Sequence, residues 1–198
     1  MSGSFTIVAC AAEHLDAVAG IYAREADGSP ATFDLEGRSR AWWQEALEHS
    51  DPTAGHLLLV ALDDDGHLLG YAKSGPFRDR PAYDSTVEVS AYVDADARGR
   101  GAGAALYAEL LAALERSDAL LAVAGITEPN EASVRLHRAH GFERVGTFHG
   151  VGVKFDRSWD VTWYERSVAG ERLTPPRTAD RPAPQRSRSG GPGSSNSA

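Results

Sequence analysis

The sequence predicts one α/β domain, with a mixed sheet of about six or seven strands flanked by about four helices. Apolar and polar residues alternate over Phe5–Cys10, which is the period of a β-strand. Apolar residues recur at helical spacing over Glu13–Ala26, and the apolar stretch Leu120–Ile126 suits a strand buried on both faces. The length of 198 residues suits one domain, and 42% apolar residues are enough to build its core.

The N-terminal half is predicted to run strand, helix, helix, strand, strand. The helix over Glu13–Ala26 is stopped by a Gly-Ser-Pro run, and a second helix with two tryptophans follows over Arg38–Glu48. His56–Leu62 and His67–Lys73 have strand composition and are separated by a turn of three aspartates and a glycine. This pair is therefore expected to form a hairpin.

The C-terminal half is predicted to alternate strands and helices and then to end in two strands. A strand–helix–strand order favours a parallel crossover in the middle of the sheet, whereas the ends of the chain favour antiparallel pairing. The expected elements are strand Thr86–Val93, helix Gly101–Arg116, strand Leu120–Ile126, helix Asn130–His140, strand Glu143–Phe155 and strand Trp159–Ser167.

Charge divides the chain into residues 1–168 and residues 169–198. The first part has 15 basic and 26 acidic residues, a net charge of −11, and is expected to be the folded domain. So acidic a body is a poor partner for nucleic acid. The last 30 residues carry a net charge of +3 and five of the ten prolines, and we expect a disordered tail, with a weak basic binding arm as the alternative.

Membrane, secretory and metal-binding classes lack support. No apolar run exceeds eight residues, whereas a bilayer span needs roughly 18, and the N-terminus shows no signal-peptide pattern. Cys10 is the only cysteine, which excludes an internal disulfide and a thiolate cluster. His137 and His140 have no evident third ligand, so no metal site is predicted. We expect a cytoplasmic protein with a buried, inert thiol at Cys10.

A glycine-rich loop joins the strand over Thr86–Val93 to the next helix. Glycines allow a ligand to approach main-chain N–H groups, and the positive end of a helix favours phosphate. Arginines at 98 and 100 add cationic donors. The loop lacks the Lys-Ser/Thr ending of a Walker A motif and the spacing of a dinucleotide loop. It is thus either a plain connection or a diphosphate site of another kind.

The motif Arg98-x-x-Gly101-x-Gly103 resembles the [Q/R]-x-x-G-x-[G/A] signature of the Gcn5-related N-acetyltransferase (GNAT) superfamily. The resemblance extends from about Phe5 to Ser167, and it is closest to the phosphinothricin N-acetyltransferase family. The segments that carry this finer resemblance are Thr32-Phe33, Gly75–Asp84, Thr86–Val93, Pro129–His137 and Gly152–Phe155.

The resemblance implies a GNAT fold in which strands 4 and 5 splay apart to admit acetyl-CoA. It also implies direct attack of an amine on the acetyl group, with a strand 4 N–H polarising the thioester carbonyl and no enzyme nucleophile. The residues it assigns to acetyl-CoA are the main chain of Ala91, Tyr92 and Val93, the loop Arg98, Gly99, Arg100, Gly101, Ala102, Gly103 and Ala104, and the side chain of Asn130.

Two residues are expected to transfer protons. Glu88 lies in the middle of a strand, on the face opposite Val87 and Val89, and is the candidate base that deprotonates the amine. An ordinary solvent-facing glutamate is the alternative. His137, seven residues after Asn130, is the candidate acid for the CoA thiolate, although a packed helix histidine has the same pattern. Asn130 also suits the N-cap of its helix.

The expected acceptor is a small amino-acid-like amine of the phosphinothricin, methionine sulfoximine or methionine sulfone type. The alternatives are a protein N-terminus or a polyamine as acceptor, a non-catalytic acyl-CoA-binding module and a nucleotide-binding protein. The resemblance also implies a homodimer, with a role in resistance or detoxification. The chain departs from the family's Phe-Gly-x-Trp-x-Asp at 155–160, where the glycine is lost. Substrate-binding candidates are Phe33, Arg78, Arg80, Tyr83 and Lys154.

Overall fold

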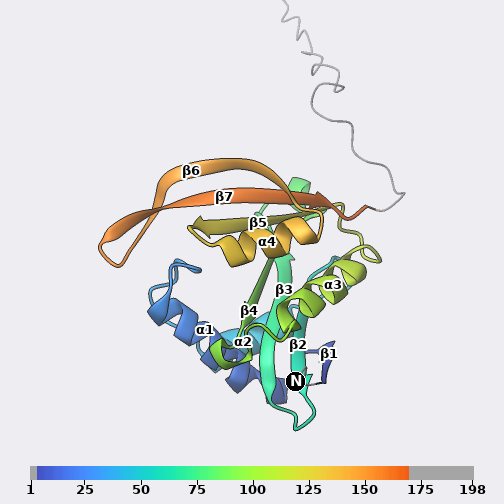
Figure 1. Ribbon diagram of the computed structural model, residues 1–198. Coiled ribbons are helices and arrows are strands. Elements are labelled where there is room, and N and C mark those ends of the chain that lie inside the picture. The colour runs from blue at the N-terminus through green and yellow to red at the C-terminus, as the bar shows by residue number, and fades with distance from the viewer. Residues whose placement is uncertain (1–3, 170–198) are drawn as a thin grey trace, which may run out of the picture.

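The computed structural model describes residues 4–169, which form a seven-stranded mixed sheet with helices on both faces (Figure 1). The strand order is β1-β2-β3-β4-β5-β7-β6. The strands are β1 (Phe5–Ala9), β2 (Leu58–Asp63), β3 (Leu68–Pro76), β4 (Thr86–Val93), β5 (Leu121–Glu128), β6 (Glu143–Lys154) and β7 (Arg157–Ser167). The helices are α1 (Leu15–Gly28), α2 (Arg40–Glu48), α3 (Ala102–Leu114) and α4 (Glu131–Ala139).

Every predicted strand and helix is present, in the predicted order, and the bounds differ by a few residues. The predicted GNAT-type mixed sheet is confirmed, with antiparallel pairs at both ends and a single parallel pair, β4 with β5. The expected tail at 169–198 lies outside the described residues, apart from its first residue. Within 4–169, none of the helices has the length and apolarity that crossing a bilayer requires.

Alternation along the strands divides the core into two layers. Leu59 on β2 and Val87 on β4 point to one face, where they pack with the leucines of α3. Val60 on β2 and Tyr71 on β3 point to the other face, beneath α1 and α2. Cys10 is buried in this second layer, and burial raises the pKa of its thiol to about 11, as expected for an inert thiol.

The second layer is rich in aromatic rings. Trp43 of α2 makes edge-to-face contacts with Tyr22 of α1 and with Tyr71 of β3, at centroid distances of 5.5 and 5.3 Å. Tyr92 of β4 packs against both tyrosines. Because these rings join α1, α2, β3 and β4, they fix the two helices firmly over the strand that carries Glu88.

The parallel pairing of β4 with β5 is short. It covers only residues 86–88 of β4 and 121–123 of β5. Beyond this point β4 remains paired with β3, and β5 continues with β7. Figure 1 shows β5, β7 and β6 running across the ends of β3 and β4, so that the sheet opens between its two halves. The predicted splaying of the fourth and fifth strands is therefore present.

The core that supports this opening predicts a clear contrast between two leucines. Leu110 of α3 is fully buried against the sheet, whereas Leu35 is 72% exposed. Leu110→Ala should lower the free energy of unfolding by about 2–5 kcal/mol, because it leaves a cavity. Leu35→Ala should change it by less than about 0.5 kcal/mol. Chemical denaturation measures both, and equal effects of the two substitutions would contradict the described packing.

Candidate active site

The opening between β4 and β5 holds a cleft of about 780 Å³. Its floor and walls come from β4, β5, the start of α3, one face of α4 and the loop after α1. The residues that line it include Ser29, Pro30, Ala31, Val89, Ser90, Ala91, Tyr92, Val93, Arg98, Gly99, Gly101, Ala102, Gly103, Ala104, Tyr107, Gly125, Asn130, Ser133 and His137. All predicted acetyl-CoA residues except Arg100 are among them, together with His137.

The edge of β4 that borders the cleft has no strand partner. Main-chain bonds from Asp94 to Leu69 and from Phe77 to Thr86 show that even-numbered β4 residues pair with β3. The N–H and C=O groups of Ala91 and Val93 therefore point away from β3 and toward the cleft, as does the C=O of Val89. The Val89 N–H is used in the last rung of the ladder with β5, at Val123. The N–H and C=O groups of Tyr92 belong to the β3 ladder, and its side chain packs in the aromatic layer. An extended ligand could bond to this edge as an added strand.

The glycine loop forms one end of the cleft. Gly99 and Gly101 have φ values of +78° and +86°, a left-handed backbone that other residues rarely adopt. Helix α3 begins directly after Gly101, without a side-chain cap. The N–H groups of residues 99–104 make no hydrogen bond to another residue within the described part of the chain. These free donors at the positive end of a helix suit a diphosphate.

The two arginines of this loop are not equivalent. Arg98 lines the cleft and forms an ion pair with Glu25 of α1, while Arg24 of α1 pairs with Asp94 at the end of β4. These pairs tie α1 to the loop and help to fix its position. Arg100 does not line the cleft. The main-chain N–H groups are therefore the principal donors of the loop, and the arginines are secondary.

On the opposite wall, Asn130 and His137 project from α4. The Asn130 side chain accepts a hydrogen bond from the Ser133 N–H at 3.0 Å, so it caps α4 as predicted. His137 is buried, and both of its ring nitrogens are engaged: Nδ1 lies 2.8 Å from the Ser133 carbonyl oxygen, and Nε2 lies 2.6 Å from the Tyr107 hydroxyl. Burial lowers the pKa of His137, which favours neutral imidazole with its proton on Nδ1.

Tyr107 is a residue of the site that sequence reasoning missed. It is fully buried, yet its hydroxyl reaches His137 at the cleft wall. In this arrangement the phenol donates to Nε2 of the imidazole. The only sequence signal is a polar-tipped side chain within the otherwise apolar buried face of α3, which is equally typical of a core residue.

Glu88 lies at the last position of β4 that pairs with β5, next to Val89, which lines the cleft. Its neighbour across β3 is Gly75, and the space where a side chain of residue 75 would stand is open. The Glu88 side chain is accessible, but partial desolvation raises the pKa of its carboxyl group, and the positive charges of Lys73 and Arg78 oppose that rise. A carboxylate with a raised pKa beside an open space can accept a proton from a ligand.

The loop before β4 places two of its predicted residues, Arg78 and Tyr83, around the ring of Phe77. The Arg78 guanidinium lies 4.4 Å from the ring centroid of Phe77, and Tyr83 contacts the same ring edge-on. Arg78 is close enough to interact electrostatically with Glu88, whereas Arg80 shows no such interaction among the described residues. Of the three predicted residues in this loop, Arg78 is therefore the one that interacts with Glu88.

The other two substrate candidates, Phe33 and Lys154, join the α1–α2 loop to β6. Lys154 is buried, and its ammonium donates to the carbonyl oxygens of Ser29 at 2.9 Å and Thr32 at 2.8 Å. The Phe33 ring lies directly over Gly152, where no larger residue would fit. In this structure both residues hold the wall of the site, and their predicted contact with substrate remains a prediction.

The departure from the family pattern at 155–160 has a structural counterpart. Phe155 and Asp156 both have positive φ values, near +55°, and form the tight turn between β6 and β7. The displaced Trp159 is buried, and its indole N–H donates to the Lys154 carbonyl at 2.9 Å. The tryptophan therefore closes the turn from its shifted position.

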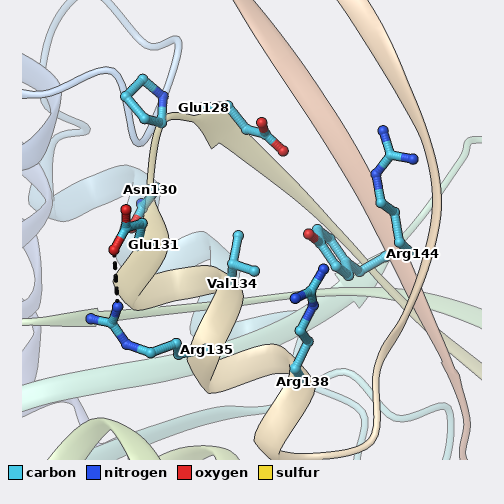
Figure 2. A pocket seen from close by; sticks show the side chains of 9 residues that line it. Glu128, Asn130, Glu131, Val134, Arg135, Arg138 and Arg144 are labelled. Carbon is cyan, nitrogen blue, oxygen red and sulfur yellow. Dashed lines mark hydrogen bonds and ion pairs between the residues drawn. The ribbon is translucent and has the colours of Figure 1, made fainter.

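A second hollow of about 430 Å³ lies on the other side of α4 (Figure 2). Arg135 and Arg138 of α4 border it, with Arg144 of β6 on the opposite side. Arg135 is paired with Glu131 at 3.2 Å. Asn130 borders both hollows, but His137 borders only the cleft between β4 and β5. The predicted acetyl-CoA residues other than Arg100, together with His137, therefore line the cleft, whereas Glu88 and the predicted substrate residues line neither hollow.

Comparison with known proteins agrees with this geometry. The family model "Acetyltransferase (GNAT) family" matches residues 17–142. A phosphinothricin N-acetyltransferase of Streptomyces coelicolor is 43% identical over 160 residues, which are 79% of this chain and 92% of that protein. An L-methionine sulfoximine/L-methionine sulfone acetyltransferase of Pseudomonas aeruginosa is 39% identical over 142 residues, 72% of this chain and 79% of its own length.

Among solved structures, a GNAT-superfamily phosphinothricin acetyltransferase from Sinorhizobium meliloti, crystallised with acetyl-CoA, is similar with a TM-score of 0.76 and 34% identity. The similarity covers 84% of this chain and 89% of that one. The splayed strands, the glycine loop at the start of α3 and these matches lead to one conclusion. The chain belongs to the GNAT family of acetyltransferases.

Proposed function

We propose that this protein transfers the acetyl group of acetyl-CoA to the primary amine of a small amino-acid-like acceptor. The observation that carries the proposal is the position of Glu88, at the point where β4 leaves β5. A proton acceptor there stands beside the unpaired edge of β4 and at the mouth of the cleft. The relatives named phosphinothricin and methionine sulfoximine/sulfone acetyltransferases support the acceptor class.

The residues present fit acetyl-CoA, which supplies the activated acetyl thioester. The free main-chain groups of Ala91 and Val93, with the C=O of Val89, suit the amide-bearing pantetheine arm, and the N–H groups of residues 99–104 suit the diphosphate. The Asn130 side chain, at the start of α4, is our candidate for a further contact with the arm. An N–H group of the free β4 edge would polarise the thioester carbonyl.

We assign the base to Glu88. An amine is mostly protonated at neutral pH and cannot attack a carbonyl until it loses a proton. The carboxylate of Glu88 takes that proton in the proposed mechanism, and the amine nitrogen then bonds directly to the acetyl carbon. No nucleophilic residue of the enzyme takes part.

We assign His137 and Tyr107 to the part of the cleft where the CoA thiolate would leave. The Tyr107 O–H donates to Nε2 of neutral His137 in this structure, and His137 thereby positions the phenol. In this proposal the O–H turns from Nε2 to the departing thiolate and donates a hydrogen bond to the sulfur. This assignment modifies the role expected for His137 from the sequence, in which the imidazole was the acid. An unchanged kcat in Tyr107→Phe would remove the role.

Three further properties are proposed on separate observations. Exposed apolar residues on β6, Val145, Phe148, Val151 and Val153, support a homodimer, which a monomeric mass in sedimentation equilibrium would refute. The single buried thiol is compatible with a cytoplasmic protein, which fractionation of producing cells would test.

A role in resistance or detoxification follows from the relatives' acceptors, and unchanged phosphinothricin tolerance in a deletion strain would argue against it.

The diphosphate site predicts opposite effects of one charge on stability and on binding. Ala104 is exposed at the start of α3 and lines the cleft. Ala104→Asp should keep or raise the melting temperature, because an acid favours a helix N-terminus, and should weaken CoA binding by roughly tenfold or more through repulsion. Calorimetric titration measures the affinity.

The matched control is Ala108→Asp, an exposed position one turn further along α3. It should bind CoA nearly as the wild type does. Wild-type binding of ATP as tight as that of CoA would favour a nucleotide-binding protein instead, and equal CoA affinities of the two variants would contradict the assigned diphosphate site.

Glu88→Gln removes the proton acceptor while preserving side-chain size. We expect kcat/KM to fall by roughly 100-fold or more. Wild-type kcat/KM should fall as the pH drops through the raised pKa of Glu88, because the protonated carboxyl cannot accept a proton. The variant should lack this limb, and its rate should rise with pH until the acceptor amine itself is deprotonated. Glu109→Gln, at an exposed position of α3, is the control.

These pH profiles are measured by steady-state kinetics on wild type and both variants. Full turnover of Glu88→Gln at neutral pH would show that the base is another group or solvent.

The acceptor class is tested with phosphinothricin, methionine sulfoximine and methionine sulfone. Wild type should acetylate at least one of them. Arg78→Met should raise KM roughly tenfold for phosphinothricin, whose distal phosphinate is anionic, and less for the neutral sulfone. Arg116→Met, at an exposed position just after α3, controls for the loss of one charge. No turnover of any of the three compounds would refute the proposed acceptor class.

A further inference from the structure

Lys73 is a cation of the site region that has no partner. It lies on β3, half-buried, and its ammonium makes no hydrogen bond or ion pair within residues 4–169. The ammonium lies over the Trp42 ring, 5.6 Å from the ring centroid. Burial lowers the pKa of Lys73, so the fold bears a cost for holding this charge at neutral pH.

The register places Lys73 beside the proposed base. Lys73 pairs with Ser90 of β4, and Glu88 pairs with Gly75, so the lysine and the glutamate are diagonal neighbours on adjacent strands. Alternation puts both side chains on the same face of the sheet, the face covered by α1 and α2. The open space at Gly75 lies between Lys73 and the loop that carries Arg78 on this face.

Ser90 adds a second unsatisfied group at the same place. Its hydroxyl oxygen is buried without a hydrogen-bond partner in the described structure, and the residue lines the cleft. Buried polar atoms are nearly always paired. An ammonium and a hydroxyl that face each other across two strands, both without partners, are therefore groups prepared for a polar ligand.

The charges around this space leave Glu88 as the one anion that is available to Lys73. Asp34 is already satisfied by a two-point ion pair with Arg38, at 2.6 and 2.7 Å, and by the Tyr22 hydroxyl. Of the charged groups that interact with Lys73, only Glu88 remains, and an acceptor ammonium would occupy it. A ligand that brings both an ammonium and a carboxylate would balance the site.

We infer that Lys73, assisted by Ser90, binds the α-carboxylate of the acceptor and makes the enzyme specific for α-amino acids over simple amines. In an α-amino acid the carboxylate is attached to the carbon that bears the amine. When the amine contacts Glu88, its carboxylate is thus within reach of the neighbouring Lys73. The loop cation Arg78 is left for the distal group. This inference rests on the proposed function and names the group that selects its acceptor.

The test compares two acceptors, methionine sulfone and its α-amide, which differ only in the carboxylate. The ratio of their kcat/KM values is measured for wild type, Lys73→Met and the charge control Arg116→Met at about pH 8.5. Intrinsic amine reactivity is the same for every enzyme and cancels between ratios. Calorimetric titration of methionine sulfone into the CoA-saturated proteins and thermal unfolding complete the measurement.

We expect wild type and Arg116→Met to prefer the free acid, and Lys73→Met to lose roughly 10- to 100-fold of that preference, mainly through KM. Lys73→Met should also bind methionine sulfone more weakly, while its melting temperature is unchanged or higher, because an unpaired ammonium has been removed from a half-buried place. Lys73→Gln, which is neutral but polar, gives the same readout if the Met variant does not fold.

Three results would overturn the inference. An unchanged preference in Lys73→Met would show that the lysine does not recognise the carboxylate. An equal loss for acid and amide, or a lower melting temperature with unchanged kinetics, would show that Lys73 acts on Glu88 or on the fold. Turnover of both acceptors without preference in wild type refutes this inference alone, whereas turnover of neither refutes the proposed function together with it.

Discussion

The site depends on one structural constraint: the parallel ladder between β4 and β5 ends after three residue pairs. Because β4 stays bonded to β3 and β5 stays bonded to β7, the two halves of the sheet separate without losing their other partners. The separation leaves main-chain groups of β4 unpaired, which is normally unfavourable inside a protein. A ligand with amide groups of its own resolves that deficit, so the opening and the cofactor class are two aspects of one feature.

Around this opening the chain keeps unusual groups where ordinary packing would not. Glycine occupies residues 99 and 101, where the backbone is left-handed, and residue 75, opposite Glu88. Lys73 and Ser90 have polar atoms without partners, although Asp34 and Arg38, on the same side of the sheet, are fully paired. The contrast between satisfied and unsatisfied polar groups marks the side of β4 where we place the acceptor.

Local sequence patterns were sufficient for the order of all eleven strands and long helices, because period-two and helical apolar patterns report burial directly. The glycine motif located the loop that we assign to the diphosphate, since the backbone at Gly99 and Gly101 needs residues without a side chain. The partners of single side chains could not be obtained in this way. Lys154 bonds to a loop more than 120 residues away, and the Tyr107–His137 contact spans 30 residues, so both depend on tertiary packing. Lys73 gave no signal at all, because a lysine within a strand usually faces solvent.

Residue-resolved amide hydrogen exchange, with and without CoA, tests the central claim most directly. The account predicts that CoA slows exchange at Ala91 and Val93 and at residues 99–104, whose N–H groups are free in the described structure. Exchange at Tyr92, whose N–H already belongs to the β3 ladder, should not change. Slowing at Tyr92 but not at its odd-numbered neighbours, or no slowing at residues 99–104, would contradict the account.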